Sequence, residues 1–308
     1  MIDNAPVIIF CYRRKIEKLI KSLLKNKEAS SSELFIFSDG FKSNHDKKDV
    51  LKLRKTLKKI KGFKSVNIFE STKNKGLANS VISGVNFVIK KFKRAIILED
   101  DLIVSPYFLN YMNSCLDYYI DDKKIWSISG YGPPLPCLKN YDKEVYLTTR
   151  SSSWGWSTWL NRWNKVDWLM KDFKNLKKNE QKIKQFEKGG NDMFKMLELQ
   201  YIGKIESWAI RFCYSQFIHS TYSVTPKNSM IQNNGFDDKF GTHNLTKNDD
   251  WDIELSNTKI KNIKCSLDSE ILYCFKKYHD LSLVTKIGYI LRKKGGYKLA
   301  KKLFTKLI

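Results

Sequence analysis

The chain has 308 residues, of which 42% are hydrophobic and 13% aromatic, and its formal net charge is +24. This length allows one large or two small domains with a substantial core, and the composition excludes an intrinsically disordered protein. The positive charge indicates attraction to an anionic partner such as nucleic acid, a phosphorylated substrate or an acidic membrane surface, although a general bias towards Lys, Asn and Ile accounts for most lysines equally well.

The N-terminus does not resemble an export signal, because no basic stretch is followed by a long apolar one. No apolar run approaches the roughly 20 residues needed to span a bilayer. The six cysteines are scattered without a C-x-x-C pair. We therefore expect reduced thiols in a cytoplasmic protein, not a disulfide framework or a zinc site.

Strands and helices are expected to alternate through the first hundred residues. Apolar β-branched runs predict strands in residues 5–12, 32–40, 64–71 and 94–100, and apolar residues at helical spacing predict helices in residues 15–26, 47–60 and 76–92. This alternation predicts an α/β fold with a mostly parallel central sheet flanked by helices. Ligands bind beyond the carboxyl ends of such strands. The polar segments at the strand ends should therefore converge on one cleft, namely residues 10–14, 37–40, 71–76 and 99–101.

The pattern changes from about Trp126. Residues 126–137 and 144–163 are rich in aromatic residues, Gly and Pro, which is more typical of a substrate-shaping region than of regular layers. Residues 167–203 predict two helices separated at Gly189-Gly190, and residues 207–220 predict another helix before a loop-rich strand region. We expect a catalytic domain over residues 1–265, with a nucleotide-binding half (1–104) and an acceptor and catalytic half (105–265).

A basic, amphipathic helical tail is expected over residues 266–308. In its last part, apolar residues share one helical face on either side of Gly295-Gly296, and lysines fill the other face. This is the composition of a helix that lies on an anionic membrane, with each basic residue worth about 1 kcal/mol. The alternative is a C-terminal helix that packs on its own domain.

Three adjacent acids, Glu99, Asp100 and Asp101, interrupt an apolar run. Their mutual repulsion and the cost of burying charge call for a cation nearby, and carboxylates at a strand end suit Mg²⁺ or Mn²⁺. Alternation along a strand would place Glu99 and Asp101 on one side and Asp100 on the other. The alternative is an N-cap for the helix that begins near Ser105, which explains one acid but not three.

Two other strand-end segments contain candidate binding groups. Asp39 could accept hydrogen bonds from a base or ribose, or could belong to an ordinary Asp-Gly turn. Lys75 and Gly76 precede a helix whose first backbone N–H groups could face a phosphate, although a helix cap explains these residues equally well.

The aromatic segment and two later residues complete the candidates. Tryptophan faces beside hydroxyl groups suit a sugar ring, and the alternative is an aromatic core. We expect Trp159 and Trp163 in the core and Trp154 and Trp156 nearer the cleft. Glu206 begins a helix, where an acid is usually a capping charge. His243 stands in a Gly-flanked loop and could bind a metal or phosphate, although a lone His is more often structural.

The order of these motifs resembles that of GT-A-fold glycosyltransferases. FCYRR, FSDG, NKG, LEDD, WGWSTW, ESWAIR and GTH follow one another between Pro6 and Asn244. The order most resembles the N-acetylglucosaminyltransferase I-like group and bacterial surface-polysaccharide sugar transferases. This resemblance implies a GT-A, Rossmann-like fold and an inverting enzyme that needs Mn²⁺ or Mg²⁺. The implied donor is a nucleotide-sugar, with UDP expected, and the implied acceptor is a glycan or lipid-linked glycan; nucleic acid is not an expected partner.

The resemblance also implies roles for particular residues. Asp101 would hold the metal as the last acid of a variant D-x-D motif, with Glu99 and Asp100 facing the nucleotide and sugar. Asp39 matches the acid that contacts the base, and His243 matches a late His that reaches the metal or diphosphate. The other residues expected around the donor are Phe10, Tyr12, Arg13, Lys75, Gly76, Trp154 and Trp156.

Glu206 matches the position of the general base. The related group often has Asp-Asp-Trp there, whereas this chain has Glu206-Ser207-Trp208, and Asp237 and Asp238 are competing candidates. Two other classes of function stay open. A metal-dependent nuclease or nucleotidyltransferase would cleave or extend DNA in a salt-dependent way, and a non-catalytic nucleotide-sugar-binding protein would show no Mn²⁺-dependent hydrolysis of the donor.

Overall fold

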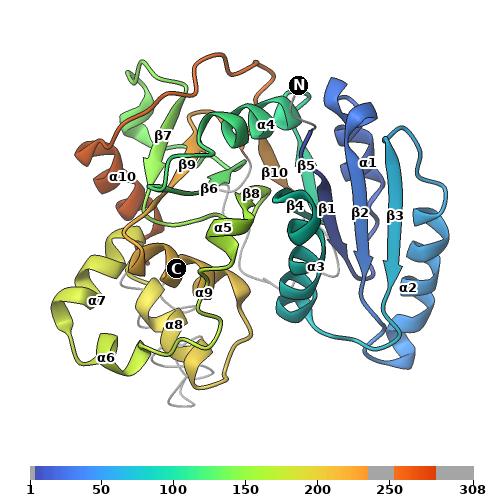
Figure 1. Cartoon of the computed structure of the whole chain (residues 1–308), viewed down its shortest axis with the longest axis horizontal. Helices are drawn as coiled ribbons and strands as arrows, with labels where there is room; N and C mark the ends of the chain where they lie inside the picture. The colour runs from blue at the N-terminus through green and yellow to red at the C-terminus, as the bar shows by residue number, and fades with distance from the viewer. Residues whose placement is uncertain (1–3, 235–252, 282–308) are drawn as a thin grey trace, which may run out of the picture.

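The computed structural model describes residues 4–234 and 253–281, and in this part of the chain eight strands form one sheet (Figure 1). The strands of this sheet are β1 (Val7–Cys11), β2 (Glu33–Ser38), β3 (Ser65–Glu70), β4 (Arg94–Glu99), β6 (Ile125–Ser129), β7 (Val145–Thr148), β8 (Trp156–Trp159) and β9 (Tyr222–Pro226). Their order across the sheet is β3-β2-β1-β4-β8-β6-β9-β7. Two short strands, β5 (Leu102–Val104) and β10 (Ile231–Asn233), pair antiparallel beside it.

The helices lie on both faces of the sheet. They are α1 (Glu17–Leu23), α2 (Asn44–Leu57), α3 (Leu77–Phe92), α4 (Phe108–Tyr118), α5 (Leu160–Trp163), α6 (Phe173–Lys177), α7 (Glu180–Phe186), α8 (Met193–Tyr201), α9 (Trp208–Ile218) and α10 (Ser269–His279), with 3₁₀ turns at Lys27–Ser31, Pro136–Leu138 and Glu187–Gly189. Buried residues of α1, α2 and α4 pack on one face, and those of α3 and α9 pack on the other. This architecture confirms the expected α/β fold class with a mostly parallel central sheet flanked by helices.

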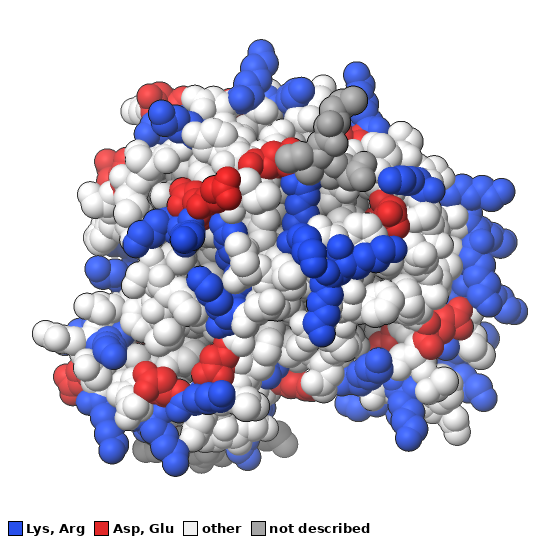
Figure 2. Space-filling model, in the orientation of Figure 1, with Lys and Arg blue, Asp and Glu red and all other residues white. Residues whose placement is uncertain are grey.

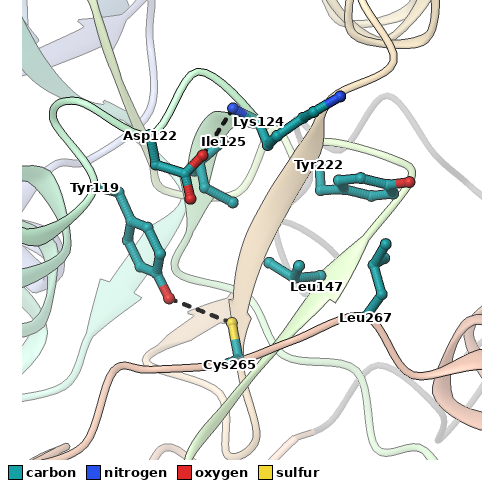
Figure 3. Close-up of a pocket in the computed structure, with 8 residues that line it drawn as sticks. All are labelled: Tyr119, Asp122, Lys124, Ile125, Leu147, Tyr222, Cys265 and Leu267. Atoms are coloured by element: carbon teal, nitrogen blue, oxygen red, sulfur yellow. Dashed lines mark hydrogen bonds between the residues drawn. The ribbon is translucent and has the colours of Figure 1, made fainter.

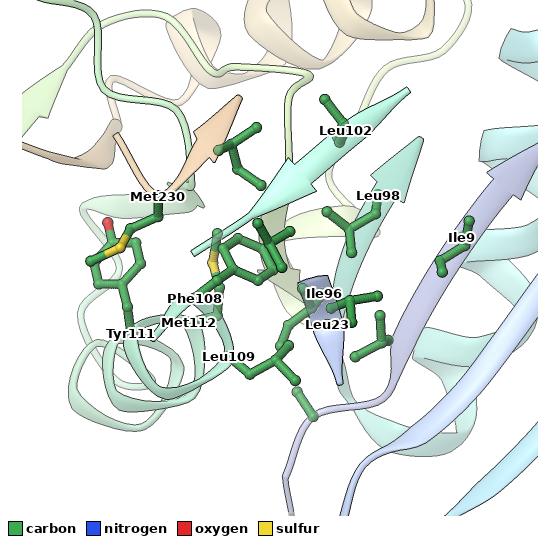
Figure 4. Close-up of a cluster of buried hydrophobic side chains, with 14 of the residues drawn as sticks. Ile9, Leu23, Ile96, Leu98, Leu102, Phe108, Leu109, Tyr111, Met112 and Met230 are labelled. Carbon is green, nitrogen blue, oxygen red and sulfur yellow. The ribbon is translucent and has the colours of Figure 1, made fainter. Parts of the chain in front are cut away.

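The strands and helices expected in the first hundred residues are confirmed. β3, β2, β1 and β4 are parallel neighbours, and the connecting helices follow each strand because a parallel pair needs a crossover. Alternate residues of β1 enter opposite cores: Ile9 packs towards α1 and α4, whereas Ile8 and Phe10 pack towards α3. Figure 4 shows Ile9, Leu98 and Phe108 in the first of these cores.

The aromatic regions at residues 126–137 and 144–163 were expected to be irregular, and this expectation is wrong. They supply β6, β7 and β8 to the main sheet. These strands lack the usual apolar β-branched signature because Ser and Thr occupy buried positions, where their hydroxyls are satisfied internally. For example, Ser127 and Ser223 share a hydrogen bond of 2.8 Å, and the Thr158 hydroxyl donates to the Trp126 carbonyl at 2.8 Å.

The region expected as two helices, residues 167–203, contains three helices and a 3₁₀ turn. The chain is interrupted between α6 and α7, where the Asn179 side chain accepts a hydrogen bond from the Lys182 N–H and caps α7. A further interruption falls at Gly190, which has a φ of 132°. Glycine adopts this backbone conformation without strain because it has no Cβ. The expected break at the two glycines is therefore present.

The start of the expected tail packs on the folded body. Ile271 and Phe275 of α10 are buried against Leu135, Leu138 and Tyr146. Past the helix, the Asp280 carboxylate accepts a hydrogen bond from the Asn191 N–H at 2.9 Å. Residues 269–281 therefore belong to the body, whereas a separate tail was expected from residue 266. The amphipathic stretch beyond residue 281 lies outside the described residues. No helix in the described part has the length and apolar character to cross a bilayer.

Candidate active site

The three acids lie where the main sheet ends and the small sheet begins. β4 ends at Glu99, and Asp100 and Asp101 form a turn before β5. We call these three residues the acid turn. The expectation that strand alternation sorts the three side chains is therefore wrong, because only Glu99 is still in a strand.

A cation already binds the acid turn. The Arg14 guanidinium donates a hydrogen bond to Asp101 Oδ2 and lies 3.9 Å from Asp100 Oδ1. Arg14 reaches the acids because β1 and β4 are parallel neighbours, so their carboxyl ends adjoin. The Tyr12 N–H also donates to Asp100 Oδ2 at 3.0 Å, which fixes the segment after β1 against the turn. Sequence reasoning placed Arg14 in the strand-end segment 10–14 but did not identify it as the cation that pairs with the acids.

Glu99 behaves differently from its neighbours. It is partly buried, and burial raises the pKa of its carboxyl to about 8, with the charges of Asp101 and Asp100 adding to the increase. Burial and the two neighbouring carboxylates therefore both favour the protonated form of Glu99.

Tyr12 and Arg13 are directed to the start of α2. The Tyr12 hydroxyl donates to Asp46 Oδ2 at 2.9 Å and accepts a hydrogen bond from the Lys42 N–H at 2.9 Å. Arg13 forms an ion pair with Asp46, a buried residue that sequence reasoning did not single out. These contacts hold both side chains beside the strand ends.

Phe10 was expected around the donor, and this expectation is corrected: its side chain is buried and cannot line an open nucleotide site. Its ring stacks on Phe37 at a centroid distance of 5.4 Å and packs under α3. Gly84 of α3 allows this contact, since a Cβ there would lie 2.6 Å from Phe10 Cε1. The backbone of Phe10 pairs with β2 and β4.

Asp39 holds the loop that precedes α3. Its Oδ1 accepts hydrogen bonds from the N–H groups of Gly40 at 2.8 Å and Lys75 at 2.9 Å. Its Oδ2 accepts from the Gly76 N–H at 3.0 Å and from the Lys75 N–H at 3.2 Å. The carboxylate thus links the end of β2 to the start of α3, which is more than an Asp-Gly turn requires.

Glu206 lies against the same loop. Its Oε1 accepts a hydrogen bond from Asn79 Nδ2 at 2.8 Å, and a Cβ at Gly76 would lie 3.1 Å from its Oε2. Glu206 is exposed. The N-cap of α9 is Ser207, whose hydroxyl accepts from the Ile210 N–H at 3.3 Å. A capping role in its own helix therefore does not account for Glu206, whereas its position at the start of α3 does bring it to the strand-end edge.

The four tryptophans divide differently from expectation. Trp159 and Trp163 are buried, as expected. Trp156 is also buried, with 1% of its surface exposed, and stacks on Trp208 at 4.8 Å. The expectation that Trp156 lines the cleft is therefore wrong, because successive residues of a central strand enter opposite covered faces. Trp154 precedes β8, is partly buried and meets Tyr131 edge-on at 4.7 Å.

β10 brings the chain back to the acid turn. It pairs with β5, and the Asn234 N–H donates to the Asp101 carbonyl at 2.8 Å. The candidates His243, Asp237 and Asp238 lie outside the described residues.

The acid turn offers two neighbouring carboxylates to a divalent cation. Among residues 4–234 and 253–281, no three His, Cys, Asp or Glu side chains form a group that could hold a metal ion. Asp100 and Asp101 nevertheless approach one cation, the Arg14 guanidinium. Mg²⁺ and similar ions use one or two carboxylates and complete their coordination with water and phosphate oxygens. These two residues therefore suit such an ion, with Asp101 as the expected ligand.

A cavity of about 310 Å³ lies elsewhere in the molecule (Figure 3). It opens where β6 and β9 begin, beside Tyr119 and Cys265, which interact at 3.4 Å. β6 runs parallel to β4 because each is antiparallel to β8. The cavity lies where β6 begins and the acid turn lies where β4 ends, so the two are at opposite ends of the strands. The cavity takes no part in the candidate site.

The first part of the chain is similar to a known family. The GNT-I family model matches residues 1–134, which contain Asp39, Arg14 and the acid turn but neither Trp154 nor Glu206. No curated protein matches the chain. GNT-I proteins are N-acetylglucosaminyltransferases, so the match confirms the expectation of a glycosyltransferase, similar over residues 1–134 to the GNT-I family.

Proposed function

We propose that this glycosyltransferase moves a sugar from a UDP-sugar to a hydroxyl group of a glycan or lipid-linked glycan, with inversion at the anomeric carbon and with Mn²⁺ or Mg²⁺ bound. The observation that supports this proposal most strongly is the row of carboxylates along one sheet edge. The Asp100 carboxylate accepts a hydrogen bond from the Tyr12 N–H, just after β1. The Asp39 N–H donates to the carbonyl of Cys11, the last residue of β1. Asp39 also binds the loop that Glu206 contacts. Ligands bind at this edge in parallel α/β sheets.

The acid turn would serve the diphosphate of the donor. A divalent ion held there supplies positive charge to the leaving diphosphate. Asp101 would bind this ion, and Asp100 would fix the segment of Tyr12 against the turn. Trp154 and the backbone of Lys75 and Gly76 would border the donor, with the N–H groups of the latter two occupied by Asp39.

Glu206 would accept the proton of the attacking hydroxyl. A hydroxyl is a weak nucleophile at neutral pH, and a positioned carboxylate typically accelerates such a step by about 10²–10⁴-fold. Asn79 holds Oε1 at 2.8 Å, so Oε2 is the oxygen that would take the proton. The hydrogen bond from Asn79 orients the carboxylate without neutralising it.

The proposal also covers the acceptor and the cellular location, which depend on the basic surface of the molecule. Figure 2 shows Lys and Arg side chains spread over this face of the molecule, with groups over α3 and along α2. Such a surface favours an anionic membrane, where a lipid-linked acceptor for bacterial surface polysaccharide would be available. We propose peripheral attachment to the inner face of the cell membrane.

The test is a screen of the full chain against nucleotide-sugars with Mn²⁺ and with excess EDTA, followed by two variants. Glu206→Gln should reduce transfer at least about a hundredfold while donor binding is retained. Its matched control is Glu180→Gln, which removes an exposed acid at the start of α7. Asp101→Asn should abolish the stimulation by Mn²⁺, with exposed Asp142→Asn as control.

Two outcomes would contradict the proposal. Full transfer in excess EDTA would exclude the metal requirement. Transfer by the Glu206 variant at the rate of its control would place the base elsewhere, with Asp237 and Asp238 as the next candidates.

A further inference from the structure

The Arg14 guanidinium contacts both aspartates of the proposed metal site, Asp100 and Asp101. The side chains of Arg14, Asp100 and Asp101 are 15%, 11% and 17% exposed, so the three charges meet in a largely desolvated place. The hydrogen bond from the guanidinium goes to Asp101 Oδ2. This contact is not a general property of the basic segment, because the adjacent Arg13 pairs with Asp46 at the start of α2.

A guanidinium on Asp101 opposes the binding of a free divalent cation. Arginine stays protonated in proteins, so this positive charge cannot be removed by a proton transfer. Asp100, Asp101 and Arg14 together carry one negative charge, about half of what the two aspartates would offer a metal ion without Arg14. Metal binding to the free protein must therefore break or weaken a charge-assisted hydrogen bond.

A nucleoside diphosphate offers Arg14 another partner. Guanidinium groups bind phosphate oxygens in a bidentate manner that matches their planar shape, and phosphate is at least as anionic as the carboxylate that would be released. The long side chain of Arg14 starts from the segment after β1, at the same edge of the sheet as the acid turn. A diphosphate that approaches the acid turn therefore comes within reach of this side chain.

We propose that Arg14 couples metal binding to donor binding. This inference rests on the proposed function. In the free protein Arg14 holds Asp101. When the diphosphate binds, the guanidinium transfers to a phosphate oxygen, and Asp101 is released to the divalent cation. The coupling is reciprocal, because any factor by which the nucleotide raises metal affinity is also the factor by which the metal raises nucleotide affinity.

The test measures Mn²⁺ affinity directly, from the electron paramagnetic resonance signal of free Mn²⁺, with and without UDP. The full chain is compared with Arg14→Gln and with Lys15→Gln, a control that removes a neighbouring exposed charge. Without UDP, Arg14→Gln should bind Mn²⁺ about 10- to 100-fold more tightly than the wild type, since a hydrogen bond to a charged group is of that strength. UDP should raise the Mn²⁺ affinity of the wild type and of Lys15→Gln by a larger factor than that of Arg14→Gln.

Arg14→Lys is the second variant, with thermal unfolding as a check that each protein is folded. It retains the charge, so its Mn²⁺ affinity without UDP should stay within about threefold of the wild type, since a lysine ammonium remains a point charge for the carboxylate. If Arg14→Gln does not fold, Arg14→Lys carries the test: UDP should raise its Mn²⁺ affinity by a smaller factor than in the wild type, because an ammonium cannot bind phosphate in a bidentate manner, and an equal factor in both proteins would overturn the inference.

The possible failures are distinct. Equal Mn²⁺ affinity of the wild type and folded Arg14→Gln, with the same UDP enhancement in both, would overturn the role of Arg14 alone. Absence of Mn²⁺ binding in every protein, with and without UDP, would overturn both this inference and the proposed metal dependence.

Discussion

Replacing Asp39 with Asn tests whether this buried acid holds the loop before α3. The carboxylate accepts hydrogen bonds from the N–H groups of Gly40, Lys75 and Gly76. An Asn side chain keeps one acceptor oxygen, which can still serve Gly40 and Lys75. Its amide group would then face the Gly76 N–H, so a donor would oppose a donor.

The magnitude follows from the bond that is lost. Asp39 is 8% exposed, so water replaces little of the lost interaction. A hydrogen bond to a charged group contributes about 1.5–3 kcal/mol, and the buried donor that is left unsatisfied adds to this cost. We expect a loss of about 2–3 kcal/mol in the free energy of unfolding. At about 2 °C per kcal/mol for a protein of this size, the midpoint of thermal unfolding should fall by roughly 4–6 °C.

The assay combines thermal unfolding with UDP binding by calorimetry. The matched control is Asp142→Asn, which makes the same charge change at an exposed position and should move the midpoint by less than about 1 °C. A midpoint equal to that of the control, together with weaker UDP binding, would refute the reasoning. That result would mean that the carboxylate serves the nucleotide base instead of the loop.

Three further predictions concern packing and pH. Gly84→Ala should cost about 1–3 kcal/mol in chemical denaturation, because its Cβ would lie 2.6 Å from the ring of Phe10; no loss would mean that α3 packs less closely than described. Trp156→Phe should lower stability by about 1–3 kcal/mol and leave UDP affinity unchanged, and weaker UDP binding would restore Trp156 to the donor site. Burial, and then the charge of Arg150, hold the pKa of His279 well below its usual value. Stability should therefore be complete above about pH 6.5 and fall as the pH is lowered, and His279→Gln should reduce this slope in unfolding midpoints measured from pH 7.5 to 5.

Local pattern was sufficient for the first hundred residues. Apolar β-branched runs and helices with one apolar face follow the periodicities of 2 and 3.6, so β1 to β4 and α1 to α3 could be located from the sequence. The parallel arrangement followed from their alternation, and it placed Asp39 and the acid turn at the same edge. The repulsion of three adjacent acids also indicated that a cation must be near, although it could not identify Arg14.

Contacts between distant segments required the tertiary structure. Arg14 and Asp101 are 87 positions apart, and Asn79 and Glu206 are 127 positions apart, so no local pattern relates them. Trp154 and Trp156 have similar neighbours in sequence, yet Trp156 is enclosed by α9 while Trp154 is not fully buried. The reason is the same in each case: burial and pairing depend on which surface covers a residue, and that surface is built by parts of the chain that only the folded sheet brings together.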